Sequence, residues 1–306
     1  MKILVTGGAG FIGSHLVEEL QGKADIYVID NFRTGKIENL NGFKLNLIEG
    51  SINDKELLRE VMVGIDFVFH MAAAISVVES MENPIKYVET NTIGTLNILE
   101  EAAKTGVKKV LFCSSSAIYG ESLELPKTED MKVEPLSPYA ITKLDGEYYC
   151  NLFTKEKGLK TVCTRFFNVF GPRQDPESQY AAAIPIFVSK AVNNEKITIY
   201  GDGKQTRDFI YVKDVVKACI YLTIENDSYG IFNVGYGKSI EINELVERIL
   251  KKTNSKSPIS YEKERPGEIK HSIASIKKLS NTNFKPLFGF DSGLDLTIDY
   301  FKKKFS

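Results

Sequence analysis

The sequence has no tryptophan, few cysteines and histidines, and no long uninterrupted apolar run. Its four cysteines are widely spaced and form no C-x-x-C pair, so they predict reduced, mostly buried thiols and argue against a disulfide framework. The three histidines are equally scattered, which argues against a metal site. No stretch of about 18 apolar residues could span a membrane, and the first residues show no signal-peptide pattern. We therefore expect a cytoplasmic protein without a bound metal.

An excess of charge of one sign is also missing. Lysine and arginine together number 39, and aspartate and glutamate number 40, so the formal net charge is −1. This balance argues against nucleic acid or a membrane surface as a partner. The 306 residues amount to about two domain-lengths, although one large α/β unit with a cap would also account for them.

Short apolar runs alternate with amphipathic stretches over the first two thirds of the chain. The runs that predict strands lie at 3–6, 26–30, 46–49, 67–71, 109–114 and 160–166. The stretches that predict helices lie at 12–20, 55–62, 84–104 and 138–156. This alternation predicts an α/β protein with a Rossmann-type doubly wound parallel sheet covered by helices on both faces.

The alternation becomes less regular after about residue 171. The elements expected there are helices at 184–192 and 214–224, strands at 197–200 and 209–212, and a further helix that begins at Asn243. We predict a nucleotide-binding domain at 1–170 and a smaller α/β substrate-binding domain at 171–306. Part of 205–228 is expected to pack back on the first domain.

The segment VTGGAGFIG places Gly8, Gly10 and Gly13 between a predicted strand and a predicted helix. Glycines at this spacing allow a tight turn and a close approach of the backbone to a pyrophosphate at the helix N-terminus. Asp30 ends the second strand, where a carboxylate can bind ribose hydroxyls and repel the 2′-phosphate of NADP. Because Arg33 lies nearby in the sequence, NADP is not excluded as the cofactor. The motif favours an NAD site over a glycine turn without a ligand.

The segment SPYAITK places Tyr139 and Lys143 four residues apart after a predicted helix start. The spacing alone does not distinguish an acid/base pair from neighbours on a solvated helix face. Tyr200 with Lys204 and Tyr300 with Lys304 show the same interval. Ser115 ends a predicted strand upstream, and its hydroxyl could be either catalytic or a satisfied strand-end group. Tyrosine titrates near pH 10, so as a base it needs a neighbouring cation such as a lysine.

Motifs spread over nearly the whole chain resemble the extended short-chain dehydrogenase/reductase family. In addition to the glycine segment and SPYAITK, they are HMAA, SSSAIYG, RFFNVFGPRQ, YGDGKQTRDFIYVKDV and RPGEIKHSIA. The last two extend the resemblance to the nucleotide-sugar branch, and the whole set is most similar to UDP-hexose 4-epimerases of the UDP-glucose and UDP-N-acetylglucosamine type. Members of this family bind NAD and form homodimers through a four-helix bundle, which here would use the helices at 84–104 and 138–156.

The resemblance implies that Ser115, Tyr139 and Lys143 are catalytic. Hydride would leave C4 of a UDP-hexose for NAD, and the 4-keto sugar would be re-reduced on its opposite face. Related dehydratases carry Asp-Glu directly after the serine, and related decarboxylases carry a glutamate at the second of these positions. Ser116 and Ala117 stand there and offer no carboxyl group. Epimerisation is therefore the reaction that the resemblance favours.

The resemblance also implies binding roles for matching positions. The expected cofactor contacts are Gly7, Gly10, Phe11, Ile12, Gly13, Asp30, Asn31, Gly35, Ser51, Ile52, Ala72, Ala73, Asn91, Tyr139, Lys143 and Phe167. The expected substrate contacts are Ser76, Ser115, Asn168, Ala183, Ile184, Ile199, Tyr200, Arg207, Arg265, Glu268 and Ser272.

Some of these positions depart from the family pattern. Ser51 stands where an aspartate commonly contacts adenine, and Glu268 stands where an aspartate usually holds the ribose. Ser272 replaces the bulky tyrosine of strict glucose/galactose epimerases, which would open room for an N-acetyl group. We expect UDP-GlcNAc and UDP-GalNAc as substrates, with UDP-Glc and UDP-Gal also accepted.

Three alternatives stay open at this point. A UDP-glucuronate 4-epimerase also lacks the Asp-Glu pair, although such enzymes tend to carry threonine where Asn168 stands. A reductase with an exchangeable cofactor is the second. A non-catalytic dinucleotide-sensing module is the third, but such proteins have lost the Tyr/Lys pair that this chain keeps.

Overall fold

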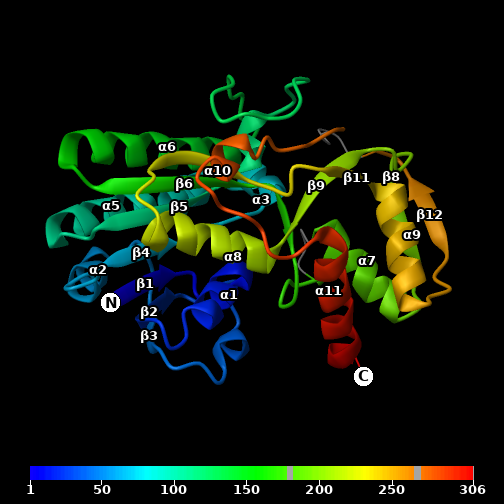
Figure 1. Ribbon diagram of the computed structural model, residues 1–306, viewed down its shortest axis with the longest axis horizontal. Helices are drawn as coiled ribbons and strands as arrows, with labels where there is room; N and C mark the ends of the chain where they lie inside the picture. Colours follow the sequence, from blue (N-terminus) through cyan, green and yellow to red (C-terminus); the bar gives the residue numbers. More distant parts are fainter. Residues whose placement is uncertain (178–181, 265–269, 306) are drawn as a thin grey trace. The chain divides into compact units, whose positions relative to one another are not determined.

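The computed structural model describes residues 1–177, 182–264 and 270–305, which divide into two compact units (Figure 1). The first unit comprises Met1–Gly120, Val133–Phe166 and Val216–Phe232, and the second comprises Glu121–Lys132, Phe167–Val215 and Asn233–Ser306. The chain passes between the units several times, so neither is one stretch of sequence. The expected nucleotide-binding and substrate-binding domains, with a boundary at residue 170, stay a prediction.

The first unit is built on a seven-stranded sheet in the order β10-β6-β5-β4-β1-β2-β3. Its strands are β1 (Lys2–Thr6), β2 (Asp25–Asp30), β3 (Asn46–Glu49), β4 (Phe67–His70), β5 (Lys109–Ser115), β6 (Lys160–Phe166) and β10 (Gly230–Val234). All five pairings from β3 to β6 are parallel, and the strand labels follow this order in Figure 1. The predicted α/β doubly wound fold is confirmed.

The strand order reverses at β1, which has β2 on one side and β4 on the other. Ligands of open parallel sheets bind beyond the carboxyl ends of the strands at such a switch point. The segments that follow β1, β2 and β4 therefore border the candidate cofactor crevice.

Helices join these strands. They are α1 (Phe11–Glu19), α2 (Lys55–Val61), α3 (Val77–Glu82), α4 (Pro84–Tyr87), α5 (Gly94–Thr105) and α6 (Pro138–Lys157), with the short helical turns η1 (Ile37–Leu40) and η3 (Ser116–Tyr119). The helix expected at 84–104 is continuous but irregular, because its middle stretch η2 (Val88–Ile93) is π-helical. α6 begins at a Ser137 cap that accepts from the Ala140 N–H at 3.2 Å, and it ends at left-handed Gly158.

An apolar core lies between the sheet and three of these helices. Leu4, Val68 and Val110 from the strands pack with Leu99 of α5 and Cys150 of α6, and all five are 1% exposed or less. Leu99 lies in the helix at 84–104 that was expected to pair with a second subunit, but it faces this core instead. Ile93 of the same helix is 46% exposed.

The second unit carries two small sheets, ordered β11-β9-β7 and β12-β8. Its strands and helices are β7 (Asn168–Phe170), α7 (Ala183–Val192), β8 (Ile197–Tyr200), β9 (Thr206–Tyr211), β11 (Ser239–Glu241), α9 (Ile242–Thr253), β12 (Ile259–Glu262), α10 (Lys277–Ser280) and α11 (Phe290–Phe305). Phe170, Phe209, Tyr211 and Phe290 form an aromatic cluster with ring centroids 5.4–6.5 Å apart.

One expectation for this part of the chain was wrong in detail, and one helix was not predicted. Val212 was predicted to end a strand, but it begins α8 (Val212–Ile220), which continues into a π-helical stretch, η4 (Tyr221–Glu225). The strand stops at Tyr211 because its pairing partner β7 ends at Phe170, opposite Tyr211. The helix α11 was not predicted, although it buries Phe290, Leu294 and Phe301.

Candidate functional site

The turn between β1 and α1 is packed too closely to accept side chains at its glycines. Gly7 has a φ of +69°, and a Cβ there would lie 2.7 Å from the Ala72 backbone nitrogen. A Cβ on Gly13 would lie 2.1 Å from the Gly7 carbonyl oxygen. Gly10 is the N-cap of α1, and no side chain caps the first N–H groups of the helix. These features fit the pyrophosphate of a dinucleotide.

Asp30 at the end of β2 holds this turn in place. Its Oδ2 accepts from the Ala9 N–H and its Oδ1 accepts from the Phe32 N–H, both at 2.9 Å. A Cβ on Gly35 would lie 2.9 Å from both carboxylate oxygens, so the chain passes close to them. Each oxygen keeps a further lone pair, which fits the ribose hydroxyls of NAD. The expected neighbours Gly35 and Asn31 thus belong to the turn that presents Asp30.

The expected cofactor residues after β3 and β4 are engaged with the chain itself. The Ser51 hydroxyl accepts from the Asn53 N–H at 3.2 Å, and Ile52 is buried. Ala72 donates its N–H to Thr6 Oγ1 at 3.2 Å. Asn91 accepts from the Ala74 N–H at 2.8 Å and donates to the Ala74 carbonyl at 2.9 Å, so it fixes the segment after β4.

Sequence analysis missed the buried histidine at the end of β4. His70 Nε2 lies 3.0 Å from Thr95 Oγ1, whose own proton goes to the Asn91 carbonyl at 2.5 Å, so Nε2 is the donor. Nδ1 then accepts from Thr6 Oγ1 at 2.8 Å. Burial, with Lys143 nearby, lowers the pKa of His70 to about 3, so the ring is neutral. His70 thus links the end of β4 to Thr6 at the end of β1 and to Thr95 of α5.

The three candidate catalytic residues come together at the end of β5 and the start of α6. Ser115 ends β5, and its hydroxyl hydrogen-bonds to Tyr139. Pro138 opens α6 and places Tyr139 in the first turn. Lys143 is buried one turn later, with its Nζ 5.9 Å from the centre of the Tyr139 ring. Tyr87 packs edge-on against Tyr139, with ring centroids 6.5 Å apart.

Burial raises the pKa of the Tyr139 phenol, the Ser115 hydrogen bond lowers it, and the neighbouring Cys113 and Tyr87 raise it again. Burial also lowers the pKa of the Lys143 ammonium, which Cys113 partly opposes. Lys143 Nζ donates to the Cys113 carbonyl at 2.7 Å rather than to the phenol. The phenol therefore keeps its proton in this arrangement and can act as a proton donor. Stabilisation of a phenolate by Lys143 stays a prediction.

A second buried network fixes the helix that carries Tyr139. Glu147, two turns after Tyr139 on α6, binds Arg165 of β6 through two hydrogen bonds of 2.9 and 2.8 Å. Ser114 donates to the same carboxylate at 2.5 Å, and Arg165 also donates to the Tyr119 hydroxyl at 2.9 Å. The strand that ends at Ser115 is thus held in register with α6.

In the second unit, several expected substrate residues gather around Thr206. The Thr206 carbonyl accepts from Arg207 Nη1 at 3.0 Å and from the Ser272 N–H at 3.2 Å. Asn168 donates to the Asp208 carbonyl at 3.0 Å. Ile184 and Ile199 are buried at 1% exposure or less, so their expected contacts would have to come through backbone.

The other expected substrate residues are spread out. Ala183 begins α7, and Tyr200 ends β8, where its carbonyl accepts from Gln205 Nε2 at 2.7 Å. Ser76 caps α3. Phe167, which was expected to contact the cofactor, donates its N–H to the Val234 carbonyl at 3.1 Å. Arg265 and Glu268 lie outside the described residues.

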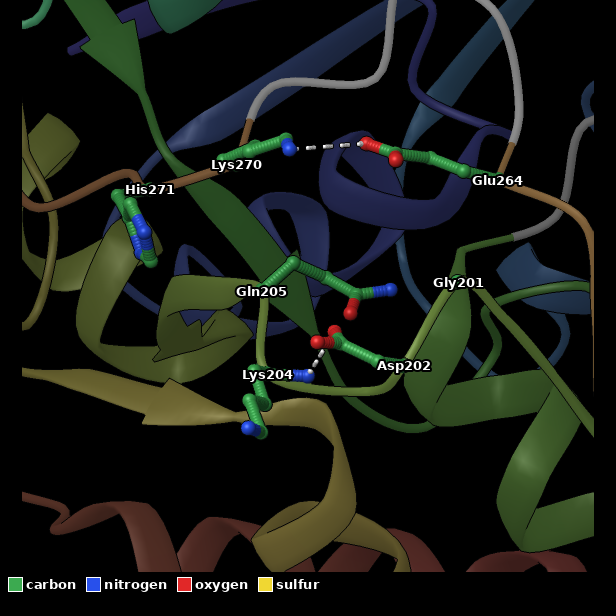
Figure 2. A pocket seen from close by; sticks show the side chains of 7 residues that line it. All are labelled: Gly201, Asp202, Lys204, Gln205, Glu264, Lys270 and His271. Carbon is green, nitrogen blue, oxygen red and sulfur yellow. Dashed lines mark hydrogen bonds and ion pairs between the residues drawn. The ribbon is translucent and has the colours of Figure 1, made fainter.

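A pocket of about 360 Å³ lies beside β8 and β9 (Figure 2). Its walls are formed by Gly201, Asp202, Lys204, Gln205, Glu264, Lys270 and His271. Figure 2 shows Lys270 directed toward Glu264, with Nζ and Oε1 3.9 Å apart. The charged side chains of the wall carry both signs, Asp202 and Glu264 beside Lys204 and Lys270.

Asp208 is a residue of this unit that sequence analysis missed. It is fully buried and accepts from the N–H groups of Tyr236, Gly237 and Ala274 at 2.7–2.9 Å. Burial raises its pKa to about 6, against the three backbone hydrogen bonds, which lower it. It ties β9 to the segments at 236–237 and 274, so its role is structural.

The described residues contain no helix with both the length and the apolar character to cross a membrane. Nor do they contain three or more His, Cys, Asp or Glu side chains placed to hold a metal ion. All four cysteines are free thiols.

Comparisons with known proteins agree with this geometry. A family model described as the NAD dependent epimerase/dehydratase family matches residues 3–235. A putative UDP-glucose 4-epimerase of Methanocaldococcus jannaschii is 39% identical over 98% of each chain. A solved UDP-N-acetylglucosamine 4-epimerase of Methanobrevibacter ruminantium, in complex with UDP-N-acetylmuramic acid, is 43% identical with a TM-score of 0.96, covering 99% of this chain and 98% of that one.

A relative named for a different reaction is almost as similar. The UDP-N-acetyl-alpha-D-glucosaminuronate decarboxylase of Bacillus cytotoxicus is 37% identical over 99% of this chain and 98% of its own. Overall similarity thus identifies the family without separating its reactions. The predicted resemblance and the dependence on NAD are confirmed at that level, and the chain belongs to the NAD dependent epimerase/dehydratase family.

Proposed function

We propose that this chain is a UDP-hexose 4-epimerase, an isomerase that inverts C4 by oxidation and re-reduction of one carbon. The observation that carries the proposal is the Ser115, Tyr139 and Lys143 cluster followed by Ser116 and Ala117. The cluster has the groups that exchange a proton with a sugar hydroxyl. The two positions after Ser115 lack the carboxyl groups that elimination or decarboxylation would need.

In this proposal NAD, when bound, supplies the acceptor and donor of the hydride. Tyr139 Oη exchanges a proton with the substrate hydroxyl, and Ser115 Oγ hydrogen-bonds to both and orients them. Lys143 is buried beside the phenol and opposes proton uptake by nearby groups through its positive charge. Glu147 and Arg165 keep Ser115 and Tyr139 in register.

The substrates we propose are UDP-GlcNAc and UDP-GalNAc, with UDP-Glc and UDP-Gal also accepted. The small side chain of Ser272, beside Arg207 around Thr206, supports room for an N-acetyl group. A widened pocket does not strongly reject a smaller sugar. The similarity to a UDP-N-acetylglucosamine 4-epimerase supports the same choice.

The test is to incubate the purified protein with UDP-GlcNAc, UDP-glucose or UDP-glucuronate, with and without added NAD, and to follow each sugar by proton NMR. We expect inversion at C4 of UDP-GlcNAc and UDP-glucose. Inversion of UDP-glucuronate alone would favour the glucuronate epimerase. Release of carbon dioxide from UDP-glucuronate would favour decarboxylation. No reaction in any arm would refute the proposal.

A further inference from the structure

Arg33 leaves the chain at the turn that presents Asp30. Its N–H donates to Asn31 Oδ1 at 3.2 Å, one residue after the Phe32 N–H has bound Asp30. An arginine near this carboxylate is the group that accommodates a 2′-phosphate in NADP-binding proteins, because its planar fork suits phosphate oxygens. On sequence alone, Arg33 therefore leaves room for NADP.

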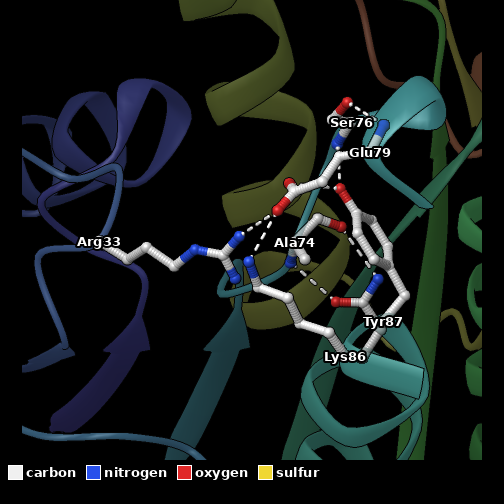
Figure 3. Close-up of polar contacts among 7 residues, drawn as sticks. Arg33, Ala74, Ser76, Glu79, Lys86 and Tyr87 are labelled. Carbon is white, nitrogen blue, oxygen red and sulfur yellow. Dashed lines mark hydrogen bonds and ion pairs between the residues drawn. The ribbon is translucent and has the colours of Figure 1, made fainter. Parts of the chain in front are cut away.

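The Arg33 side chain is bound elsewhere in the structure. Its Nη2 lies 2.7 Å from Glu79 Oε1 on α3, the helix that follows β4 (Figure 3). Since β1 lies between β2 and β4, the pair joins segments on opposite sides of the glycine turn. The guanidinium is thus directed from the β2 side, where Asp30 ends, toward the β4 side.

Glu79 is fixed more firmly than in an ordinary surface ion pair. Lys86 Nζ lies 2.7 Å from its Oε1, and the Tyr87 hydroxyl donates to its Oε2 at 3.0 Å. Tyr87 is fully buried, and its hydroxyl in turn accepts from the Ser76 N–H at 3.0 Å. These groups, led by Lys86, lower the pKa of Glu79, so its charge persists at neutral pH. An isolated exposed pair would hold Arg33 only weakly, but a network with a buried anchor restricts it.

We propose that Glu79 makes this chain selective for NAD over NADP by holding Arg33 away from the ribose bound at Asp30. The inference rests on the proposed NAD site in this crevice. A 2′-phosphate would meet the Asp30 carboxylate and could recruit Arg33 only by breaking the pair with Glu79. Asp30 and Glu79 therefore act together, one by repulsion and the other by keeping the compensating cation occupied.

The test compares binding of NAD and NADP to the wild type, Glu79→Gln, Arg33→Ala and the double variant. Both dissociation constants are measured by competition against NADH fluorescence. We expect Glu79→Gln to bind NADP about tenfold more tightly than the wild type, with NAD within about threefold, because one charged phosphate contact becomes available. The double variant should bind NADP no more tightly than the wild type. Arg33→Ala alone should leave NAD binding within about threefold.

Glu19→Gln is the matched control, because Glu19 also binds two cations, Lys23 at 2.8 Å and Lys217 at 3.7 Å. It should leave both constants unchanged. Unchanged NADP binding in Glu79→Gln, or a gain that survives in the double variant, would refute the selectivity role. A loss of NAD affinity above about tenfold in Arg33→Ala would also refute it, since Arg33 would then contact a part common to both cofactors. These outcomes are read from cofactor binding without sugar substrate, whereas failure of the proposed function is seen in the sugar assay.

Discussion

In the proposed reaction Tyr139 has the most exacting task of any single residue, because its phenol would exchange a proton while burial opposes its ionisation. Ser115 is the one neighbour on the chain that lowers the phenol pKa directly. Lys143 Nζ is held by the Cys113 carbonyl at 2.7 Å. The proposed function therefore makes turnover depend on the Tyr139 hydroxyl rather than on its ring.

Tyr139→Phe removes this hydroxyl and keeps the ring that packs against Tyr87. We expect kcat for C4 inversion to fall by a factor of about 10³, since general acid-base groups contribute about 10² to 10⁴. The midpoint of thermal unfolding should change little, because only one hydrogen bond is lost. Tyr300→Phe, from the Tyr-x-x-x-Lys pair on α11, is the matched control and should keep full activity. Residual activity of Tyr139→Phe above about a tenth would mean that another group transfers the proton.

His70 makes a different contribution at the same scale. Its pKa is about 3 in the folded protein and about 6.5 when unfolded, so the unfolded chain binds the proton first as the pH falls. The free energy of unfolding should therefore decrease as the pH falls below about 6.5, by up to about 1.4 kcal/mol per pH unit. This loss continues towards pH 3, where the folded form also takes up the proton.

The measurement is urea unfolding of the wild type and His70→Asn between pH 4.5 and 7. In the variant, the free energy of unfolding should fall less steeply with decreasing pH, because one proton fewer is taken up on unfolding. This difference in slope does not depend on the absolute stability of the variant. Other groups, among them Asp208, titrate in both proteins and cancel in the comparison. Equal slopes for the wild type and His70→Asn would contradict a buried neutral ring.

At the scale of elements, the β1–α1 turn depends on a close approach of two backbone segments. Gly7 follows β1 with a φ of +69°, and a Cβ there would meet the Ala72 backbone at 2.7 Å. Ala72 in turn lies after β4 and donates to Thr6. A side chain at Gly7 would push apart the two segments that border the cofactor crevice.

Gly7→Ala can be compared with Gly22→Ala to separate this contact from backbone strain. Both glycines have similar positive φ values, +69° and +72°, but a Cβ on Gly22 meets nothing within 4 Å. We expect Gly22→Ala to cost about 1–2 kcal/mol of stability through conformation alone. Gly7→Ala should cost clearly more and should weaken NAD binding at least about tenfold. Chemical unfolding and NADH fluorescence measure the two effects. Equal costs would show that the contact with Ala72 does not matter.

At the scale of the whole molecule, α6 presents an apolar face that its own unit does not cover. Ile141, Tyr148 and Leu152 follow one another at helical spacing and are 48%, 62% and 50% exposed. Exposed apolar residues grouped in this way commonly mark protein interfaces. They support the expected homodimer through paired helices, which stays a prediction.

Light scattering of the purified protein tests this prediction, with a dimer mass as the expected result. Leu152→Glu combined with Tyr148→Glu should give a monomer, because two carboxylates would be buried at the interface. Leu123→Glu changes a residue that is 96% exposed outside α6 and should leave the dimer intact. A monomeric wild type would refute the paired-helix dimer.

The sequence alone determined the features that local spacing encodes. Strand and helix periods predicted the doubly wound sheet. Gly10, Gly13 and Asp30 lie within one strand–helix–strand unit, so the dinucleotide-binding motif could be recognised from residues close together in the sequence. The Tyr139 and Lys143 interval was not informative until the resemblance joined it to Ser115. The helix α11 escaped prediction although its apolar spacing was present in the sequence.

Only the tertiary structure decided which distant residues meet. Arg33 and Glu79 are 46 positions apart, and Asp208 and Ala274 are 66 apart. Helical and strand periods show which face of an element is apolar, but a partner of this kind depends on the order of strands in the sheet. That order is set by burial of the whole core, to which nearly every element contributes. On sequence alone Arg33 is a possible ligand of NADP, but in the structure it binds Glu79. This pairing follows from the position of β1 between β2 and β4.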